Sequence, residues 1–190
     1  MTVFDSVTTP YPAKLLAEDF LLLDRAGAFS AYSKTELIDG TIYVVNAQYS
    51  EHFKAKVRLL RRLADACDAL GTGLEAWSEG TIALSASSMP EPDVFVTCKT
   101  PMSGPVDKDT VILVVEVADT TQAFDLGEKS LAYARGGVPE YWVLDLKARI
   151  VHRRWAPGPD GYGQDYVTLF GERIEASTIT GLAIETDGLE

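Results

Sequence analysis

The chain has 190 residues, of which 46% are hydrophobic and 24% charged, and this composition excludes a low-complexity or disordered protein. Asp and Glu number 28 against 17 Lys and Arg, and the resulting formal charge of −11 argues against a general affinity for nucleic acids or anionic membranes. We expect a single domain over residues 1–190, with its core at about residues 13–170.

The sequence favours a soluble, cytoplasmic protein. Cys67 and Cys98 fall in a helical pattern and at a strand end, which argues against a disulfide framework and for a reducing compartment. The first residues lack the basic and apolar pattern of a signal peptide. No apolar run approaches the roughly 20 residues that span a bilayer, so we expect no membrane partner.

The first half of the chain predicts a helix, a hairpin and a second helix. Residues 13–26 have a helix-like distribution of apolar side chains that ends at Gly27. Residues 36–45 form two β-rich runs around Asp39-Gly40, a dipeptide that supplies the positive φ angles of a tight turn. Apolar residues between 51 and 70 recur every three or four positions, as in a long amphipathic helix.

The polar face of this long helix is basic, which leaves two interpretations open. Such a face is usually solvated, yet in a chain this acidic a basic strip is the natural contact for a phosphate backbone. The strip contains Lys54, Lys56, Arg58, Arg61 and Arg62.

The second half predicts several strands and one further helix. Four short runs, at 74–77, 81–84, 93–97 and 111–117, are separated by turn signals and should pair into one sheet. A further strand at 140–144 precedes a hairpin formed by 150–155 and 162–170. This order of elements predicts an α/β or α+β fold, with a mixed sheet flanked by helices.

The helix in this half should begin near Asp125. Asp125 and Glu128 have the spacing of a capping box, which places Lys129 on the first turn, and Gly136-Gly137 can close the helix. A lysine at a helix start is opposed by the helix dipole at a cost of about 0.3–1 kcal/mol. That cost would be explained by a function for Lys129.

Two acids in buried strand patterns suggest a metal site. Asp93 begins one apolar run and Glu116 lies inside another, and burying an ionised carboxylate costs several kcal/mol unless it is paired or binds a cation. Oxygen ligands alone suit Mg²⁺ or Mn²⁺. Lys129 beside such a cation can position or activate the attacking water, or stabilise negative charge in phosphodiester hydrolysis.

These residues also carry a resemblance to a known family. Pro92-Asp93, a strand ending in Glu116-Val117 and a following basic residue resemble the PD-(D/E)XK nuclease superfamily. A longer stretch is similar to the Uma-two family of bacterial restriction endonucleases. Residues 36–40 also resemble the N-terminal signature of this family. The longer stretch comprises residues 113–121, Asp125, Lys129, 133–135 and 137–145.

The resemblance implies a restriction-endonuclease-like core and a metal-dependent endonuclease acting on nucleic acid, with DNA as the expected substrate. It makes Asp93 and Glu116 metal ligands and catalytic residues, and Glu36 a further ligand. The superfamily usually has its lysine two residues after the second acid, where this chain has Ala118. The resemblance therefore assigns the lysine's role to Lys129, from the following helix.

Two more residues of that helix match family positions. Asp125 lies one turn before Lys129 and Tyr133 one turn after it, so the three share a face. Asp125 or Tyr133 can orient Lys129 or a phosphate, although the capping-box pattern already gives Asp125 a structural role as a helix cap.

A second hypothesis is a catalytically inactive nuclease-fold module that binds nucleic acid or protein, which the charge of −11 favours. In that case Asp93 caps a strand, Glu116 pairs with an arginine and Lys129 is solvated. His52 and His152 have no partner at metal-ligand spacing and do not support zinc. Superfamily members are often dimeric, which leaves a homodimer open.

Overall fold

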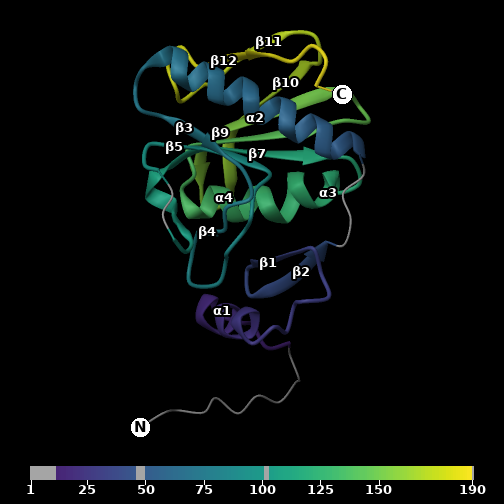
Figure 1. Ribbon diagram of the computed structural model, residues 1–190, viewed down its shortest axis with the longest axis vertical. Coiled ribbons are helices and arrows are strands. Elements are labelled where there is room, and N and C mark those ends of the chain that lie inside the picture. The colour runs from purple at the N-terminus through teal and green to yellow at the C-terminus, as the bar shows by residue number, and fades with distance from the viewer. Residues whose placement is uncertain (1–11, 46–49, 101–102, 190) are drawn as a thin grey trace.

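The computed structural model describes residues 12–45, 50–100 and 103–189, and is built around a six-stranded mixed sheet (Figure 1). The strand order is β10-β9-β8-β7-β5-β3, and every neighbouring pair is antiparallel except β7 and β8. The strands are β3 (Glu75–Trp77), β5 (Val94–Thr97), β7 (Val111–Ala118), β8 (Glu140–Asp145), β9 (Ile150–Gly158) and β10 (Gly161–Leu169).

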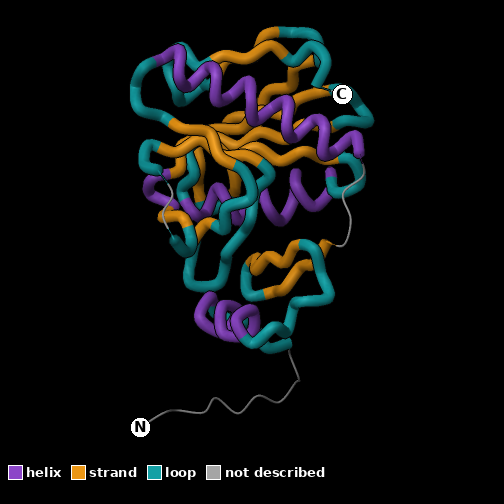
Figure 2. The backbone as a smooth tube through the Cα atoms, viewed as in Figure 1, coloured by secondary structure: helices purple, strands orange, loops and turns teal. Residues whose placement is uncertain are grey.

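Helices cover both faces of this sheet (Figure 2). The long helix α2 (Ser50–Leu70) lies on one face. The other face carries a helix made of α3 (Gln122–Phe124), a π-helical turn (Asp125–Lys129) and α4 (Ser130–Gly136). This second helix is the crossover that joins the parallel strands β7 and β8, a connection that parallel pairing requires.

Alternation along β7 divides the core in two. Leu113, Val115 and Val117 pack with the buried face of α2. Val114 and Ala118 point to the opposite side and pack with α4. Because side chains alternate along a strand, Glu116 belongs to the α4 side, and an ionisable group is thereby directed into the second core.

The N-terminal segment forms a separate layer beyond the α3–α4 helix (Figure 1). It comprises α1 (Ala17–Arg25) and the hairpin of β1 (Lys34–Ile38) and β2 (Thr41–Val45). Asp39 and Gly40 make the turn with φ of 46° and 73°, as the sequence predicted. Phe20 of α1, Leu37 and Met89 form a small core of their own.

The order of elements agrees with the sequence-based expectation, with three differences. Residues 81–84 do not join the central sheet, because β4 (Ile82–Ala83) pairs in parallel with the short β6 (Val106–Asp107). A hairpin of β11 (Arg173–Glu175) and β12 (Ala183–Glu185) was not expected. A short 3₁₀ turn at Lys108–Thr110 completes the elements described.

The third difference concerns the start of the crossover helix. The helix begins at Gln122, so the predicted capping box at Asp125 is wrong. Asp125 lies inside the helix and accepts a hydrogen bond from Thr121 Oγ1 at 2.6 Å. Lys129 is consequently not on the first turn, and the expected cost of placing a lysine against the helix dipole does not apply.

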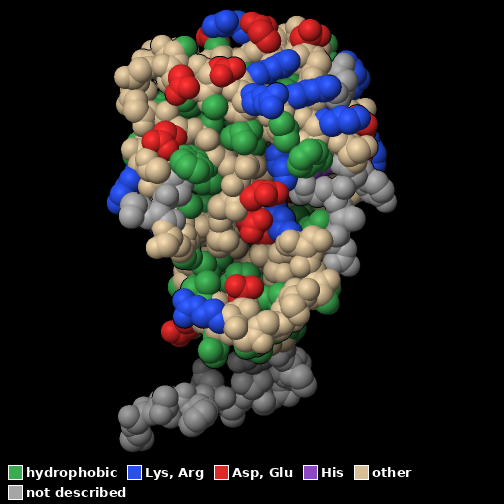
Figure 3. Space-filling view, viewed as in Figure 1, with side chains coloured by type: hydrophobic (Ala, Val, Ile, Leu, Met, Phe, Trp, Pro, Cys, Tyr) green, Lys and Arg blue, Asp and Glu red, His purple; other side chains and the backbone are tan. Residues whose placement is uncertain are grey.

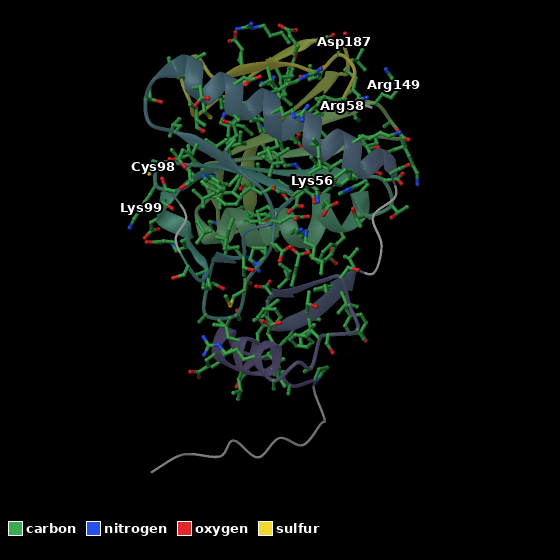
Figure 4. The ribbon with its side chains drawn as sticks, viewed as in Figure 1. Lys56, Arg58, Cys98, Lys99, Arg149 and Asp187 are labelled. Carbon is green, nitrogen blue, oxygen red and sulfur yellow. The ribbon has the colours of Figure 1, made fainter. Side chains whose placement is uncertain are left out.

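The basic face of α2 is only partly solvated. Lys56 is buried and pairs with Glu79, and Arg62 donates to the carbonyls of Glu185 and Asp187. Figure 4 shows Lys56 and Arg58 leaving α2 in different directions, Arg58 toward the chain segment that holds Asp187. Lys54, Arg58 and Arg61 are exposed, and Figure 3 shows a basic patch over this helix.

Two further expectations can be compared with the structure. Cys67 and Cys98 are both free thiols. Among the described residues, no helix has both the length and the apolar character needed to cross a membrane.

Packing of the crossover helix against Leu84, which follows β4, yields a first prediction. A Cβ atom at Gly136 would overlap the buried side chain of Leu84, whereas one at Gly127, earlier in the same helix, would meet open space. We expect Gly136→Ala to lower the free energy of unfolding by about 1–3 kcal/mol, the usual cost of overpacking. The matched Gly127→Ala should raise it by up to about 1 kcal/mol. Urea denaturation measures both, and equal effects would contradict the packing described.

Candidate active site

A cavity of about 300 Å³ lies between the β1–β2 hairpin, the central sheet and the crossover helix. Its fourteen lining residues include five carboxylates and two lysines, together with apolar side chains from β2 and α3. The carboxylates and lysines are Glu36, Asp93, Glu116, Asp119, Asp125, Lys34 and Lys129. All four residues singled out from the sequence, Glu36, Asp93, Glu116 and Lys129, therefore line one cavity.

Strand register explains why Asp93 and Glu116 meet. Val94 pairs with Val115 in antiparallel register, and extending this pairing by one residue sets Asp93 opposite Glu116. Residues opposite each other on neighbouring strands have Cβ atoms about 4.5–5.5 Å apart. The backbone N–H of Val117 donates to Asp93 Oδ2 at 2.9 Å and fixes that carboxylate at the end of its strand.

Lys129 connects three elements of the fold. Its ammonium lies 2.7 Å from Glu116 Oε1 on β7 and 2.9 Å from Glu36 Oε1 on β1. Lys129 and both glutamates are at most 3% exposed. The lysine ends the π-helical turn, a type of helix defect that is frequent at functional sites.

The carboxylates around Lys129 differ in their electrostatics. Burial raises the pKa of Glu116 to about 8, with support from the charges of Asp93 and Asp125 and against the effect of Lys129. Burial alone would also raise the pKa of Glu36, but Lys129, Lys34 and the Glu91 amide outweigh it and lower that pKa. Glu36 is therefore the ionised partner of Lys129, while Glu116 retains a proton near neutral pH.

The ammonium itself stays charged. Burial alone would lower the pKa of Lys129, yet the charges of Glu116 and Glu36 raise this pKa well above its ordinary value. Near neutral pH, Lys129 is thus a hydrogen-bond donor and not a base.

Sequence reasoning missed two residues of this cavity, His52 and Lys34. His52, on the first turn of α2, lies with Nε2 3.2 Å from Asp93 Oδ2. Its Nδ1 atom is buried and has no hydrogen-bond partner among the residues that the structure describes. Lys34 Nζ lies 3.9 Å from Asp93 Oδ1. Burial alone would raise the pKa of Asp93, but the His52 hydrogen bond and the Lys34 charge lower it.

Asp125 and Tyr133 occupy the positions that their spacing implied, one turn on either side of Lys129. Tyr133 donates its hydroxyl to Glu116 Oε1 at 3.1 Å. Asp125 is held by Thr121 and is buried, and its charge acts on Lys129. Both residues thus contribute to the surroundings of the Lys129–Glu116 pair.

The donor chemistry fits a hard cation held by two carboxylates and water. Within residues 12–45, 50–100 and 103–189, no three His, Cys, Asp or Glu side chains lie close enough together to hold a metal ion by themselves. Mg²⁺, however, retains several waters and is commonly bound through one or two carboxylates. Lys129 and Tyr133 both contact Glu116 through its Oε1 atom. The Lys34 ammonium lies 3.9 Å from Asp93 Oδ1, which is too long for a hydrogen bond.

The mixed sheet with a helix on each face, and an acid pair beside a lysine at one strand end, define a restriction-endonuclease-like fold. The comparisons with known proteins agree. The chain belongs to the Uma2 family, whose model is described as "Putative restriction endonuclease" and matches residues 17–187. No curated protein matches the chain.

A solved structure shares this fold. It is a protein from Anabaena variabilis whose title describes a "putative nuclease belonging to DUF820", and it superposes with a TM-score of 0.63. Sequence identity is 15%, and the match covers 87% of this chain and 89% of the other. At this identity the likeness concerns the fold, which agrees with the one expected from the sequence.

The two glutamates that hold Lys129 yield a second prediction. The unfolded chain releases the Glu116 proton near pH 4.5, whereas the folded protein keeps it to about pH 8. The folded state binds more protons in this window, so the Glu116 carboxyl lowers the free energy of unfolding as pH rises. We expect the free energy of unfolding of Glu116→Gln to rise relative to that of wild type between pH 5 and pH 8.

Glu36→Gln is the matched control for this prediction. The pKa of Glu36 is lowered, so its contribution to stability is present above pH 4.5 and is lost as pH falls below it. This variant should therefore cost about 1–3 kcal/mol at neutral pH, because Lys129 loses its ionised partner. Urea denaturation at pH 5 and pH 8 compares the two, and equal destabilisation by both variants at pH 8 would contradict the assignment.

Proposed function

We propose that the protein is a nuclease that hydrolyses phosphodiester bonds with the help of Mg²⁺ or Mn²⁺. One observation carries this proposal: Glu36, Asp93, Glu116 and Lys129, from four separate places in the sequence, converge on one cavity. Membership of a family described as restriction endonucleases supports it and makes DNA the first substrate to test.

The charge of the cavity favours a divalent cation. Five carboxylates and two lysines line it, so a phosphodiester would be repelled unless a cation offset the excess of negative charge. Asp93 and Glu116 would hold the ion, with Glu36 as a further ligand. When bound, Mg²⁺ or Mn²⁺ would lower the pKa of a coordinated water and offset charge on the phosphate oxygens.

The protein's own groups would orient the reaction. Because the pKa of Lys129 is raised well above its ordinary value, its ammonium would donate hydrogen bonds to phosphate oxygens or to the attacking water. His52 and the Val117 amide would hold Asp93 through Oδ2, and Tyr133 would hold Glu116. These contacts keep the carboxylates in place before any substrate binds.

The alternative is a catalytically inactive module that retains the nuclease fold. It is favoured by one observation: the Lys129 ammonium already contacts two of the proposed ligands, Glu36 and Glu116. This alternative predicts that no metal supports cleavage of any nucleic acid.

The third prediction concerns the cleavage of nucleic acid. With Mg²⁺ or Mn²⁺, wild type should cleave plasmid DNA or oligonucleotides, and EDTA should abolish the reaction. Asp93→Ala and Lys129→Met should each lower the rate at least about 100-fold, the effect of losing a charge-stabilising group at a reaction centre. Glu128→Ala, an exposed neighbour of Lys129 on the same turn, is the matched control. Equal rates in all four proteins would refute the proposal.

His52 provides the fourth prediction, which is read out by metal binding. Groups that orient a ligand typically contribute 10–100-fold to metal affinity, so His52→Ala should weaken Mn²⁺ binding by about that factor. His52→Gln, which retains an N–H donor, should recover part of the loss. His152→Ala, on β9, serves as the control for removing an imidazole elsewhere. Calorimetry at pH 8 measures the affinities, and unchanged binding by His52→Ala would show that it does not orient Asp93.

A further inference from the structure

The cavity has an aromatic wall that the proposed chemistry does not use. Tyr43 of β2 and Phe124 of α3 both line the cavity, with ring centroids 4.4 Å apart and an interplanar angle of 41°. Val44 and Val45 extend the same wall along β2. The proposed hydrolysis uses carboxylates, a cation and a lysine, but no aromatic ring.

This wall stands beside the acids and not at a distance from them. Phe124 immediately precedes Asp125 and lies five positions before Lys129. Tyr43 pairs with Glu36 across the β1–β2 hairpin. Phe124 thus lies on the helix that carries Lys129, and Tyr43 on the strand paired with the one that carries Glu36, so a molecule bound at the acids lies near the rings.

The size of the cavity limits what can enter. Its volume is about 300 Å³, and the carboxylates of Glu36, Asp93 and Glu116 belong to residues at most 3% exposed. In a duplex the base faces are stacked inside the helix, so a phosphate could not reach these acids while presenting a base face to the rings. A single strand has unstacked bases that can be turned toward aromatic side chains.

We propose that the cavity binds single-stranded nucleic acid, with one nucleobase against the Tyr43–Phe124 wall and the adjoining phosphodiester at Asp93 and Glu116. This inference rests on the proposed function and names its class of substrate. Stacking on an aromatic ring accepts any base, since every base has a π face. The site should consequently show little sequence preference.

Binding, and not cleavage, tests this inference. The protein is the Lys129→Met variant with Mn²⁺, which the proposed function makes inactive, and the probes are fluorescent 12-residue oligomers of dT and rU and a duplex of the same length. Fluorescence anisotropy should show tighter binding of one or both single strands than of the duplex. The dT and rU arms distinguish DNA from RNA. A duplex bound as tightly as the better-bound single strand would overturn the proposal.

Variants of the wall separate stacking from packing. Tyr43→Leu and Phe124→Leu keep an apolar side chain, and each should weaken single-strand binding about 5–150-fold, equivalent to the 1–3 kcal/mol of one stacked base. Tyr43→Phe retains the ring and should bind like the parent protein. Thermal denaturation checks that each variant is folded. Equal affinities for Tyr43→Leu and Tyr43→Phe would overturn the proposal.

An oligomer without bases completes a double-mutant cycle. On a fully abasic strand, which retains only sugar and phosphate, Tyr43→Leu should have no further effect, and a persisting effect would contradict stacking. The outcomes also separate this inference from the proposed function. If wild type binds single strands through Tyr43 but never cleaves them, the proposed nuclease function alone is refuted. If wild type cleaves duplex as fast as single strands, and Tyr43→Leu does not change these rates, the single-strand inference alone is refuted.

Discussion

The site depends on one buried ammonium, that of Lys129, which lies between Glu36 and Glu116. An unpaired charge at this depth would cost several kcal/mol, so the β1–β2 hairpin, the central sheet and the crossover helix must come together for it to be paired. The hairpin has its own small core with α1 and reaches the rest of the protein partly through this contact. The cavity lies where these three elements meet, and its acids are oriented before any ligand arrives.

The same constraint gives the cavity its chemistry. Lys34 and Lys129 are fewer than the carboxylates they face, so the acids remain in excess. Burial, with support from the charges of Asp93 and Asp125, raises the pKa of one of these acids, Glu116, to about 8. A carboxyl group that burial keeps protonated is a natural place for an additional cation, because binding would replace a proton with a charge that the other carboxylates also stabilise. The electrostatics of the cavity therefore support the proposed dependence on a divalent cation.

Periodicity and strand order made much of the fold predictable, but contacts between distant segments were not. The stripe of α2, the Asp39-Gly40 turn and the apolar runs of β5 and β7 are local signals, and they identified the elements that present Asp93 and Glu116. The β11–β12 hairpin has no comparable local signal. The segment that joins its two strands is held by a distant residue, Glu140, which accepts hydrogen bonds from the backbone N–H groups of Ser177 and Thr178. His52 and Lys34 were missed for the same reason, because they meet Asp93 only in the folded protein. The error at Asp125 arose because a capping-box pattern and a π-helical turn share the same residues.

The central claim is that Asp93 and Glu116 hold a divalent cation beside Lys129. A crystal structure of the protein soaked in Mn²⁺, with anomalous data, tests it most directly. We predict an anomalous peak coordinated by both carboxylates, with Lys129 still in contact with Glu36. An absence of anomalous density at this place under saturating Mn²⁺, with the Lys129–Glu116 contact unchanged, would contradict the claim.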